Sequence, residues 1–224
     1  MKATFLGQAG LLFDFDGLRV MVDPYFSNSV GKLHPEKNRR QKADLSFLDE
    51  RPDVLVLTHD HLDHTDPETL ELLLREHSGI CVLAGQNAWN TAREFGGDHN
   101  YVCFTPGCIW TEGTVSFEAV FAAHSDETAI GVLIRHNGKV YYITGDTLRS
   151  RRVAESLGCH PDVVFLPING VGNNMNMADA AAFATEIGAK QAVPLHFGMF
   201  DDLNPTEFAF ENRVIPEIWK EIVL

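Results

Sequence analysis

Six consecutive residues, His-Asp-His-Leu-Asp-His at 59–64, restrict the structures open to this 224-residue chain more than any other segment. They follow the apolar run 54–58, which has the length of a buried strand, and they precede Asp66 and Pro67, which are typical of the start of a helix. Three imidazoles and a carboxylate on one tight loop can converge on a point, and zinc, iron and manganese accept both ligand types. The segment therefore predicts a metal site at the carboxyl end of a strand, rather than a solvated loop rich in histidine.

Apolar and β-branched runs recur along the chain and are separated by helical stretches. Strands are expected at residues 3–6, 11–15, 18–22, 54–58, 80–84, 101–104, 114–123, 129–135, 139–144, 162–167 and 191–195. Helices are expected at residues 67–77, 87–95, 149–157, 177–187 and 206–212. This order predicts an α/β (α+β) fold in four layers, an αββα sandwich. Residues 1–224 contain no internal repeat and no linker, so we expect one domain, with a long basic loop at about residues 24–46.

Three further ligand candidates stand where later strands are expected to end. His124 follows one strand, Asp146 follows another, and His196 follows a third. Taken singly, each histidine could be a satisfied core residue and Asp146 a turn residue. Taken together, they share the topological position of the 59–64 loop, and loops at one edge of the sheets meet. The predicted metal ligands are His59, His61, Asp63, His64, His124, Asp146 and His196.

The formal net charge of −13 argues against nucleic acid and anionic membranes as partners. The chain has no apolar run of transmembrane length and no signal-peptide pattern, so a cytoplasmic location is expected. One stretch is basic instead, with Lys32, Lys37, Arg39, Arg40 and Lys42. It is either a solvated loop or a mobile flap over a site for a small anionic substrate, and in the second case we expect Arg39 and Arg40 to contact that substrate.

Amide and carboxylate side chains on other loops are candidates for supporting parts. Asn169 and the asparagine-rich residues 172–176 follow an expected strand, and their amides can bind a polar substrate. The helix that begins after Asn176 would favour a negative group there. Turn and cap chemistry is the alternative for Asn169 and Asn176. Asp23 follows strand 18–22 and could hold the second ring N–H of a metal-bound histidine, or simply end the strand.

These segments resemble the metallo-β-lactamase superfamily, in order and over nearly the whole chain. The matching residues are the HxHxDH segment at 59–64, His124, Gly145-Asp146 and His196. Within that superfamily the chain looks most like the L-ascorbate-6-phosphate lactonase group. The matching phrases are THDHLDHTD at 58–66, AHSD at 123–126, YITGDT at 142–147, PING at 167–170 and PLHFG at 194–198.

The resemblance implies a sandwich of the metallo-β-lactamase type with two divalent metal ions, zinc or manganese, with iron as a third choice. One ion would take His59, His61 and His124. The other would take Asp63, His64 and His196, with Asp146 bridging both. The residues implied as catalytic are Asp63, His124 and Asp146, and Asp63 would also handle a proton. The group it resembles also implies a homo-oligomer.

The activity implied by the resemblance is hydrolysis. A hydroxide held by the metal ions would open a lactone or cleave another ester of a small, phosphorylated polar substrate. The superfamily leaves other classes open. N-acyl-phosphatidylethanolamine phospholipase D also looks related, which makes a phosphodiesterase the main alternative. A redox di-iron protein would typically carry glutamate where His61 stands, and a binding module without catalysis need not keep seven ligand candidates.

Overall fold

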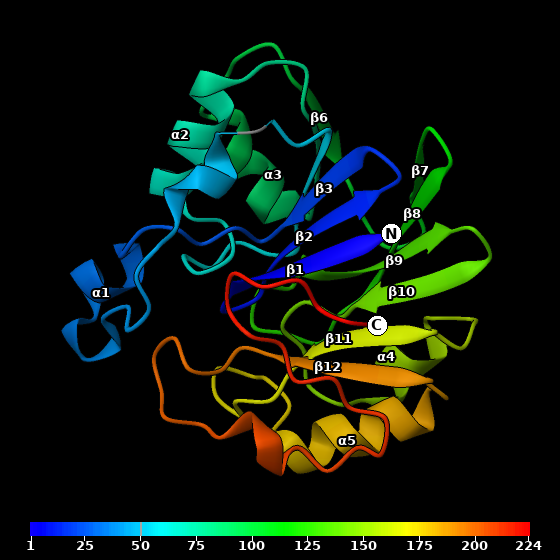
Figure 1. The fold of residues 1–224 in the computed structure, drawn as a ribbon. Helices are drawn as coiled ribbons and strands as arrows, with labels where there is room; N and C mark the ends of the chain where they lie inside the picture. The colour runs from blue at the N-terminus through cyan, green and yellow to red at the C-terminus, as the bar shows by residue number, and fades with distance from the viewer. Residues whose placement is uncertain (50) are drawn as a thin grey trace.

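The computed structural model describes residues 1–49 and 51–224 of the chain. Two six-stranded sheets face each other, and helices cover the outer side of each sheet (Figure 1). The strand order is β1-β2-β3-β4-β5-β6 in the first sheet and β12-β11-β10-β9-β8-β7 in the second. The predicted αββα sandwich is therefore confirmed.

The first sheet joins an antiparallel half to a parallel half. Its strands are β1 (Lys2–Gly7), β2 (Gly10–Phe15), β3 (Leu18–Val22), β4 (Val54–Leu57), β5 (Cys81–Ala84) and β6 (Asn100–Cys103). Pairing is antiparallel from β1 to β3 and parallel from β3 to β6. The turn between β2 and β3 at Asp16-Gly17 has φ angles of 56° and 101°, which is the positive-φ geometry that a tight hairpin requires.

The second sheet has the same plan. Its strands are β7 (Ile109–Glu112), β8 (Val115–Phe121), β9 (Ile130–His136), β10 (Lys139–Ile143), β11 (Val163–Pro167) and β12 (Gln191–Leu195). Pairing is antiparallel from β7 to β10 and parallel from β10 to β12. Sequence analysis did not predict β7. This strand is at the edge of its sheet and alternates between exposed and half-buried residues, so it carries no apolar run.

The main hydrophobic core fills the space between the sheets. Phe13 of β2 packs edge to face on Phe165 of β11, with ring centroids 5.4 Å apart. In β4, Val54 and Val56 face this core while Leu55 and Leu57 face the helices, because side chains alternate along a strand. Burial of both faces explains why β4 is apolar throughout.

The helices outside the sheets are α2 (Pro67–Glu76) and α3 (Gln86–Arg93) on the first sheet, and α4 (Arg151–Glu155) and α5 (Met177–Glu186) on the second. The predicted caps are present. Asp66 accepts a hydrogen bond from the backbone N–H of Glu68 at 3.3 Å. Asn176 accepts one from the N–H of Asp179 at 2.9 Å. No helix in residues 1–49 and 51–224 combines the length and the apolar character needed to cross a membrane.

Two expectations about the loops need correction. The expected loop at about 24–46 contains a short helix, α1 (Ser29–Leu33), and the 3-10 helices η1 (Pro35–Lys37) and η2 (Leu45–Leu48). The helix expected at 206–212 is wrong, since only η3 (Pro205–Glu207) forms there. Phe208 and Phe210 stack with centroids 6.4 Å apart, and this spacing of two residues suits extended chain rather than a helix.

Candidate metal centre

The seven predicted ligands lie at one edge of the sandwich because strand directions agree there. β1, β3 and β4 run in one direction in the first sheet, and β8, β10 and β12 share a direction in the second. β4, β8, β10 and β12 each lead into loops that carry the seven residues, and β1 and β3 lead into Gln8 and Asp23 beside them. The backbone N–H of Ile130 donates to the carbonyl of Thr58 at 3.0 Å and joins the two sheets at this edge.

Gly145 lets the two sheets approach each other beside the cluster. It has a φ of 59°, which favours glycine. A Cβ atom here would lie 2.8 Å from the carbonyl oxygen of Ile130 and 3.0 Å from Cβ of Thr58. Neither Ile130 nor Thr58 can move away without displacing the end of a strand. A side chain at position 145 would therefore clash with the neighbouring sheet, which is why glycine precedes Asp146.

The first group of ligand atoms is a triad of imidazoles. Nε2 of His59 and Nε2 of His124 lie 3.1 Å and 3.2 Å from Nδ1 of His61. His59 is buried, whereas His61 and His124 are half-buried. Three converging ring nitrogens, with His61 at the lining of a cavity, match the ligand set of catalytic metal sites.

The second group contains Asp63, His64 and His196. Nε2 of His196 lies 3.2 Å from Oδ2 of Asp63, and Nε2 of His64 lies 3.8 Å from the same oxygen. Asp146 lies against both histidines, with Oδ1 3.4 Å from Nε2 of His64 and Oδ2 3.3 Å from Nε2 of His196. The two groups adjoin, since the rings of His59 and His64 are 4.0 Å apart.

One unpaired atom in this cluster shows that a cation fits. Nε2 of His64 is buried and has no hydrogen-bond partner among the described residues. An unpaired buried nitrogen is costly. It faces the carboxylates of Asp63 and Asp146. A metal ion among these atoms would satisfy the nitrogen and the carboxylates together, and the donor set of imidazole and carboxylate suits zinc, manganese or iron.

Asp23 contacts His64 on the side of its ring away from Asp63 and Asp146, which is the first of the two roles that sequence analysis left open for it. Its Oδ2 lies 2.8 Å from Nδ1 of His64 and accepts the Thr58 hydroxyl at 2.6 Å. Its Oδ1 accepts the Thr58 backbone N–H at 2.8 Å. Such a carboxylate keeps the ring proton on Nδ1 and leaves Nε2 free for a metal ion.

Gln8 contacts the second group from the turn after β1. Its Nε2 donates to Oδ2 of Asp63 at 2.7 Å and lies 3.0 Å from Nε2 of His196. Its backbone carbonyl accepts the N–H of His196 at 2.7 Å. Gln8, Asp23 and His196 all have positive φ, at 54°, 42° and 61°. Strained backbone of this kind concentrates at functional sites, where the surrounding structure holds it.

Two asparagines complete the contacts around the cluster. Nδ2 of Asn174 donates to Oδ2 of Asp146 at 2.8 Å. The amide of Asn169 lies 2.9 Å from Nδ1 of His196. Because an amide can turn its oxygen or its nitrogen toward a partner, Asn169 can accept the Nδ1 proton of His196 and so leave Nε2 available for a metal ion.

The histidines of the cluster differ in their electrostatic environment. Burial lowers the pKa of His59 well below its ordinary value, and His64 adds to the effect. Burial would also lower the pKa of His196, but Asp146 outweighs it and the pKa rises to about 9. The pKa of His64 is raised well above its ordinary value, because Asp146, Asp63 and Asp23 outweigh its burial. The second group therefore attracts positive charge, whether a proton or a metal ion.

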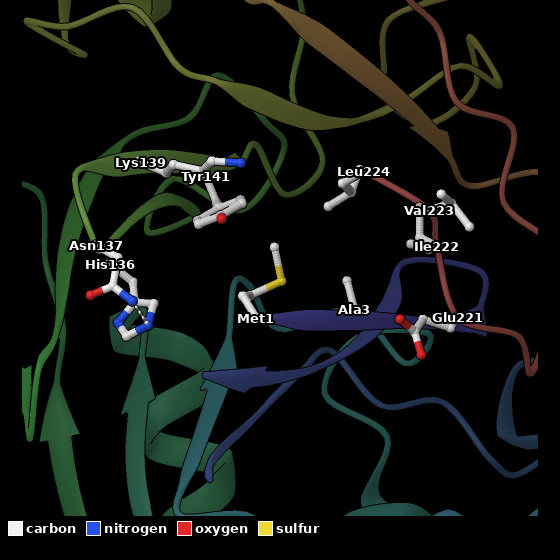
Figure 2. Close-up of a pocket in the computed structure, with 10 residues that line it drawn as sticks. All are labelled: Met1, Ala3, His136, Asn137, Lys139, Tyr141, Glu221, Ile222, Val223 and Leu224. Carbon is white, nitrogen blue, oxygen red and sulfur yellow. Dashed lines mark hydrogen bonds between the residues drawn. The ribbon is translucent and has the colours of Figure 1, made fainter. Parts of the chain in front are cut away.

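A cavity of about 490 Å³ opens above the ligands. His61, Asp63, Asp146 and His196 form its floor. A second cavity of about 360 Å³ lies at the opposite end of the sandwich, where β1 and β10 begin (Figure 2). Met1, His136, Lys139 and the C-terminal residues surround it, and its described lining contains none of the seven predicted ligands. The 490 Å³ cavity is therefore the candidate substrate site.

The four predicted substrate residues have different surroundings. Asn169 lines the cavity above the ligands. Asn176 caps α5, as its alternative interpretation has it. Arg39 donates to the carbonyl of Tyr25 at 2.6 Å with its guanidinium over the Tyr25 ring, and Arg40 pairs with Asp202. Arg39, Arg40 and Asn176 are outside the described lining of the cavity.

Sequence reasoning missed Gln8, and it included Asn174 only within the run 172–176, as a possible substrate contact and not as a partner of Asp146. Gln8 follows β1 at the same edge as the ligands, and this position is the signal that could have identified it. Asn174 stands in a run of polar residues, and nothing in the sequence separates it from its neighbours. Only the folded chain shows that its side chain meets Asp146.

Comparison with known proteins identifies the class to which this fold and site belong. Residues 18–197 match the family described as the beta-lactamase superfamily domain. A UPF0173 metal-dependent hydrolase of Staphylococcus saprophyticus is 30% identical over 96% of this chain and 93% of its own. Another from Geobacillus thermodenitrificans is 29% identical over 99% of this chain and 96% of its own. The solved structure of Igni18, a metallo hydrolase from the archaeon Ignicoccus hospitalis, shares the fold with a TM-score of 0.80 and 21% identity, over 98% of this chain and 96% of that one.

The chain belongs to the metallo-β-lactamase superfamily and, within it, to the UPF0173 metal-dependent hydrolase family. It is accordingly a metal-dependent hydrolase, and its cluster of histidines and aspartates is suited to the metal.

Proposed function

We propose that the protein is a dinuclear hydrolase that opens a lactone, or cleaves another ester, of a small, phosphorylated polar substrate. The observation that carries the proposal is the pair of adjoining ligand groups, His59, His61 and His124 beside Asp63, His64 and His196. Asp146 contacts His64 and His196 directly. Its charge also acts on His59 and His124, where it opposes the lowering of their pKa by burial. This position supports Asp146 as the bridge between two ions.

Two divalent ions in these groups would acidify a water molecule and polarise the scissile carbonyl. The chain's own residues would prepare that chemistry. Asp23 orients His64, and Gln8 and Asn174 hold the carboxylates of Asp63 and Asp146. Such contacts restrict the motion of the side chains that would hold the metal ions. Restricted side chains keep the reacting groups in the geometry that the reaction needs. Asp63 also lines the cavity, which supports the part in proton transfer that the resemblance implies for it.

The substrate part of the proposal rests on the size and polarity of the cavity. A volume of about 490 Å³ accommodates a small molecule, and Asn169, Asn174 and Ser125 give its wall hydrogen-bonding groups. The segments shared with the L-ascorbate-6-phosphate lactonase group, such as PING at 167–170, support an ester or lactone of a sugar-like acid. The net charge of −13 argues against nucleic acid as substrate.

Elemental analysis and an activity panel test the proposal together. Protein loaded with zinc or manganese would be assayed on sugar lactones, their phosphates, simple carboxylic esters and phosphodiesters. About two metal equivalents and turnover of a lactone or ester are expected. One equivalent would overturn the dinuclear centre. Turnover of phosphodiesters alone would favour the alternative activity, and turnover of none would overturn the proposal.

Asp60→Asn supplies a matched control for variants of the loop. Asp60 stands between His59 and His61 but is exposed. It is not part of the described cavity lining. We expect Asp60→Asn to retain metal and turnover, whereas Asp146→Asn loses both.

A further inference from the structure

We infer that Lys37, with His34 beside it, binds the anionic group of the substrate at the rim of the cavity. The inference rests on the proposed function, which puts the scissile bond at the ligand cluster. It replaces Arg39 and Arg40 as the anion-binding residues of the basic stretch.

Most cations of that stretch are already engaged. Nζ of Lys32 lies 2.6 Å from Oε1 of Glu68, and Arg40 pairs with Asp202. The guanidinium of Arg39 donates to the carbonyls of Tyr25 and Gln41, both at 2.6 Å. These contacts hold the segment against the rest of the protein, and Lys32, Arg39 and Arg40 are all outside the described lining of the cavity.

Lys37 and His34 differ from their neighbours because they line the cavity. Among the described residues no carboxylate pairs with the Lys37 ammonium. Nδ1 of His34 lies 3.7 Å from Oε1 of Glu36, and the His34 ring remains largely exposed. A cation that lines a substrate cavity and has no anionic partner is the group that an anionic ligand would meet first.

The segment that carries these two residues is well fixed. The N–H of Lys37 donates to the carbonyl of His34 at 2.8 Å. The amide of Asn28 donates to Asn38 at 2.9 Å and accepts the N–H of Arg39 at 2.8 Å. The backbone around Lys37 is therefore already held by hydrogen bonds before a ligand arrives. This reduces the conformational entropy that the backbone would lose on binding.

The other charges around the cavity direct an anion to the same place. Asp63 and Asp146 at the floor would repel it, apart from the reacting group that the metal ions attract. Asp201 also lines the cavity, but its Oδ1 already accepts the N–H groups of Gly198 and Leu203 at 2.9 Å and 3.1 Å. The geometry thus favours a substrate with a reactive ester at one end and a phosphate or carboxylate at the other.

Binding of ring-opened sugar acids tests this inference without requiring turnover. Gluconate, glucarate and 6-phosphogluconate share a six-carbon chain and a carboxylate for the metal end, and they differ at the far carbon, which carries a hydroxyl, a carboxylate or a phosphate. Calorimetric titration of zinc-loaded protein would compare them. We expect glucarate or 6-phosphogluconate, the two acids with an anionic group at the far carbon, to bind more tightly than gluconate, and the one that binds tighter would name the preferred anion.

Lys37→Gln should weaken that tighter binding by about fivefold, the scale of one partly exposed charged contact, and leave gluconate unchanged. Lys42→Gln removes the same charge from an exposed residue outside the described cavity lining and should change none of the three. His34→Gln should have a smaller effect in the direction of Lys37→Gln. Equal binding of the three acids, undetectable binding of all of them, or an unchanged preference in Lys37→Gln would overturn the inference. Absence of ester turnover in the activity panel would instead overturn the proposed function, so the two failures are distinguishable.

Discussion

Replacement of Asp23 by asparagine should weaken metal binding through the proton on a ligand histidine. Asp23 is 1% exposed, and its two oxygens accept three hydrogen-bond donors from Thr58 and His64. Because the Asp23 carboxylate accepts a hydrogen bond from Nδ1 of His64, the ring proton stays on Nδ1. The lone pair of Nε2 then faces Asp63 and Asp146, where the metal ion is expected.

An asparagine cannot satisfy both partners. If its NH2 group faces His64, Nδ1 must accept, the ring proton moves to Nε2 and the metal loses its lone pair. If its oxygen faces His64, the NH2 group meets the Thr58 N–H, and this buried donor stays unpaired at about 1–3 kcal/mol. The first orientation keeps the Thr58 backbone hydrogen bond and is favoured. We therefore expect the zinc affinity to fall by about 10- to 100-fold, or ~1.4–2.8 kcal/mol.

Competition with a chromogenic chelator would measure this affinity, and circular dichroism melting would check folding. Asp16→Asn is the matched control, since Oδ2 of Asp16 lies 3.1 Å from Nε2 of His136 in a similar pair at the opposite end of the sandwich. That variant should bind zinc as the parent does. A folded Asp23→Asn protein with the parent's zinc affinity would refute the reasoning.

Asp146→Ala should lose both hydrolysis and bound metal. His136→Ala should be less stable but should keep metal and turnover per folded molecule. Elemental analysis and a turnover assay check both variants, and an Asp146→Ala protein that keeps metal and activity would show that the cluster is misassigned. Zinc affinity should rise with pH up to about 9, because the metal displaces the proton that Asp146 stabilises on His196. The metal-free protein should respond oppositely in melting experiments, since the stability from protonated His196 is complete below about pH 6.5 and is lost as the pH rises to about 9. Gln8→Met removes the amide that contacts Asp63 and should lower zinc affinity about tenfold in the chelator assay, and an unchanged affinity would limit Gln8 to packing. Gly145→Ala should lower the free energy of unfolding by about 1–3 kcal/mol in denaturant titration, because its Cβ would lie 2.8 Å from the Ile130 carbonyl.

The sequence by itself predicted the layers, which the fold confirms, and a set of seven candidate ligands that the fold brings together. Local patterns were sufficient where one chemical requirement dominates a short segment. The apolar run of β4 predicts a strand buried on both faces, and Asp16-Gly17 predicts the hairpin because few residues accept positive φ. The meeting of the candidate ligands could be predicted because they stand on loops that follow strands, and parallel strands bring their carboxyl ends to one edge of a sheet.

The tertiary structure alone decided which polar groups support those ligands and which cations reach the cavity. Gln8 and Asn174 contact Asp63 and Asp146 across large sequence separations, and a single chain carries no local signal for such contacts. In the basic stretch all five cations look alike in sequence. Their roles separate only when partners distant in the chain, such as Glu68 and Asp202, engage some of them and leave Lys37 at the cavity. The physical reason is that a charge acts over distances in space, whereas sequence patterns report only neighbours along the chain.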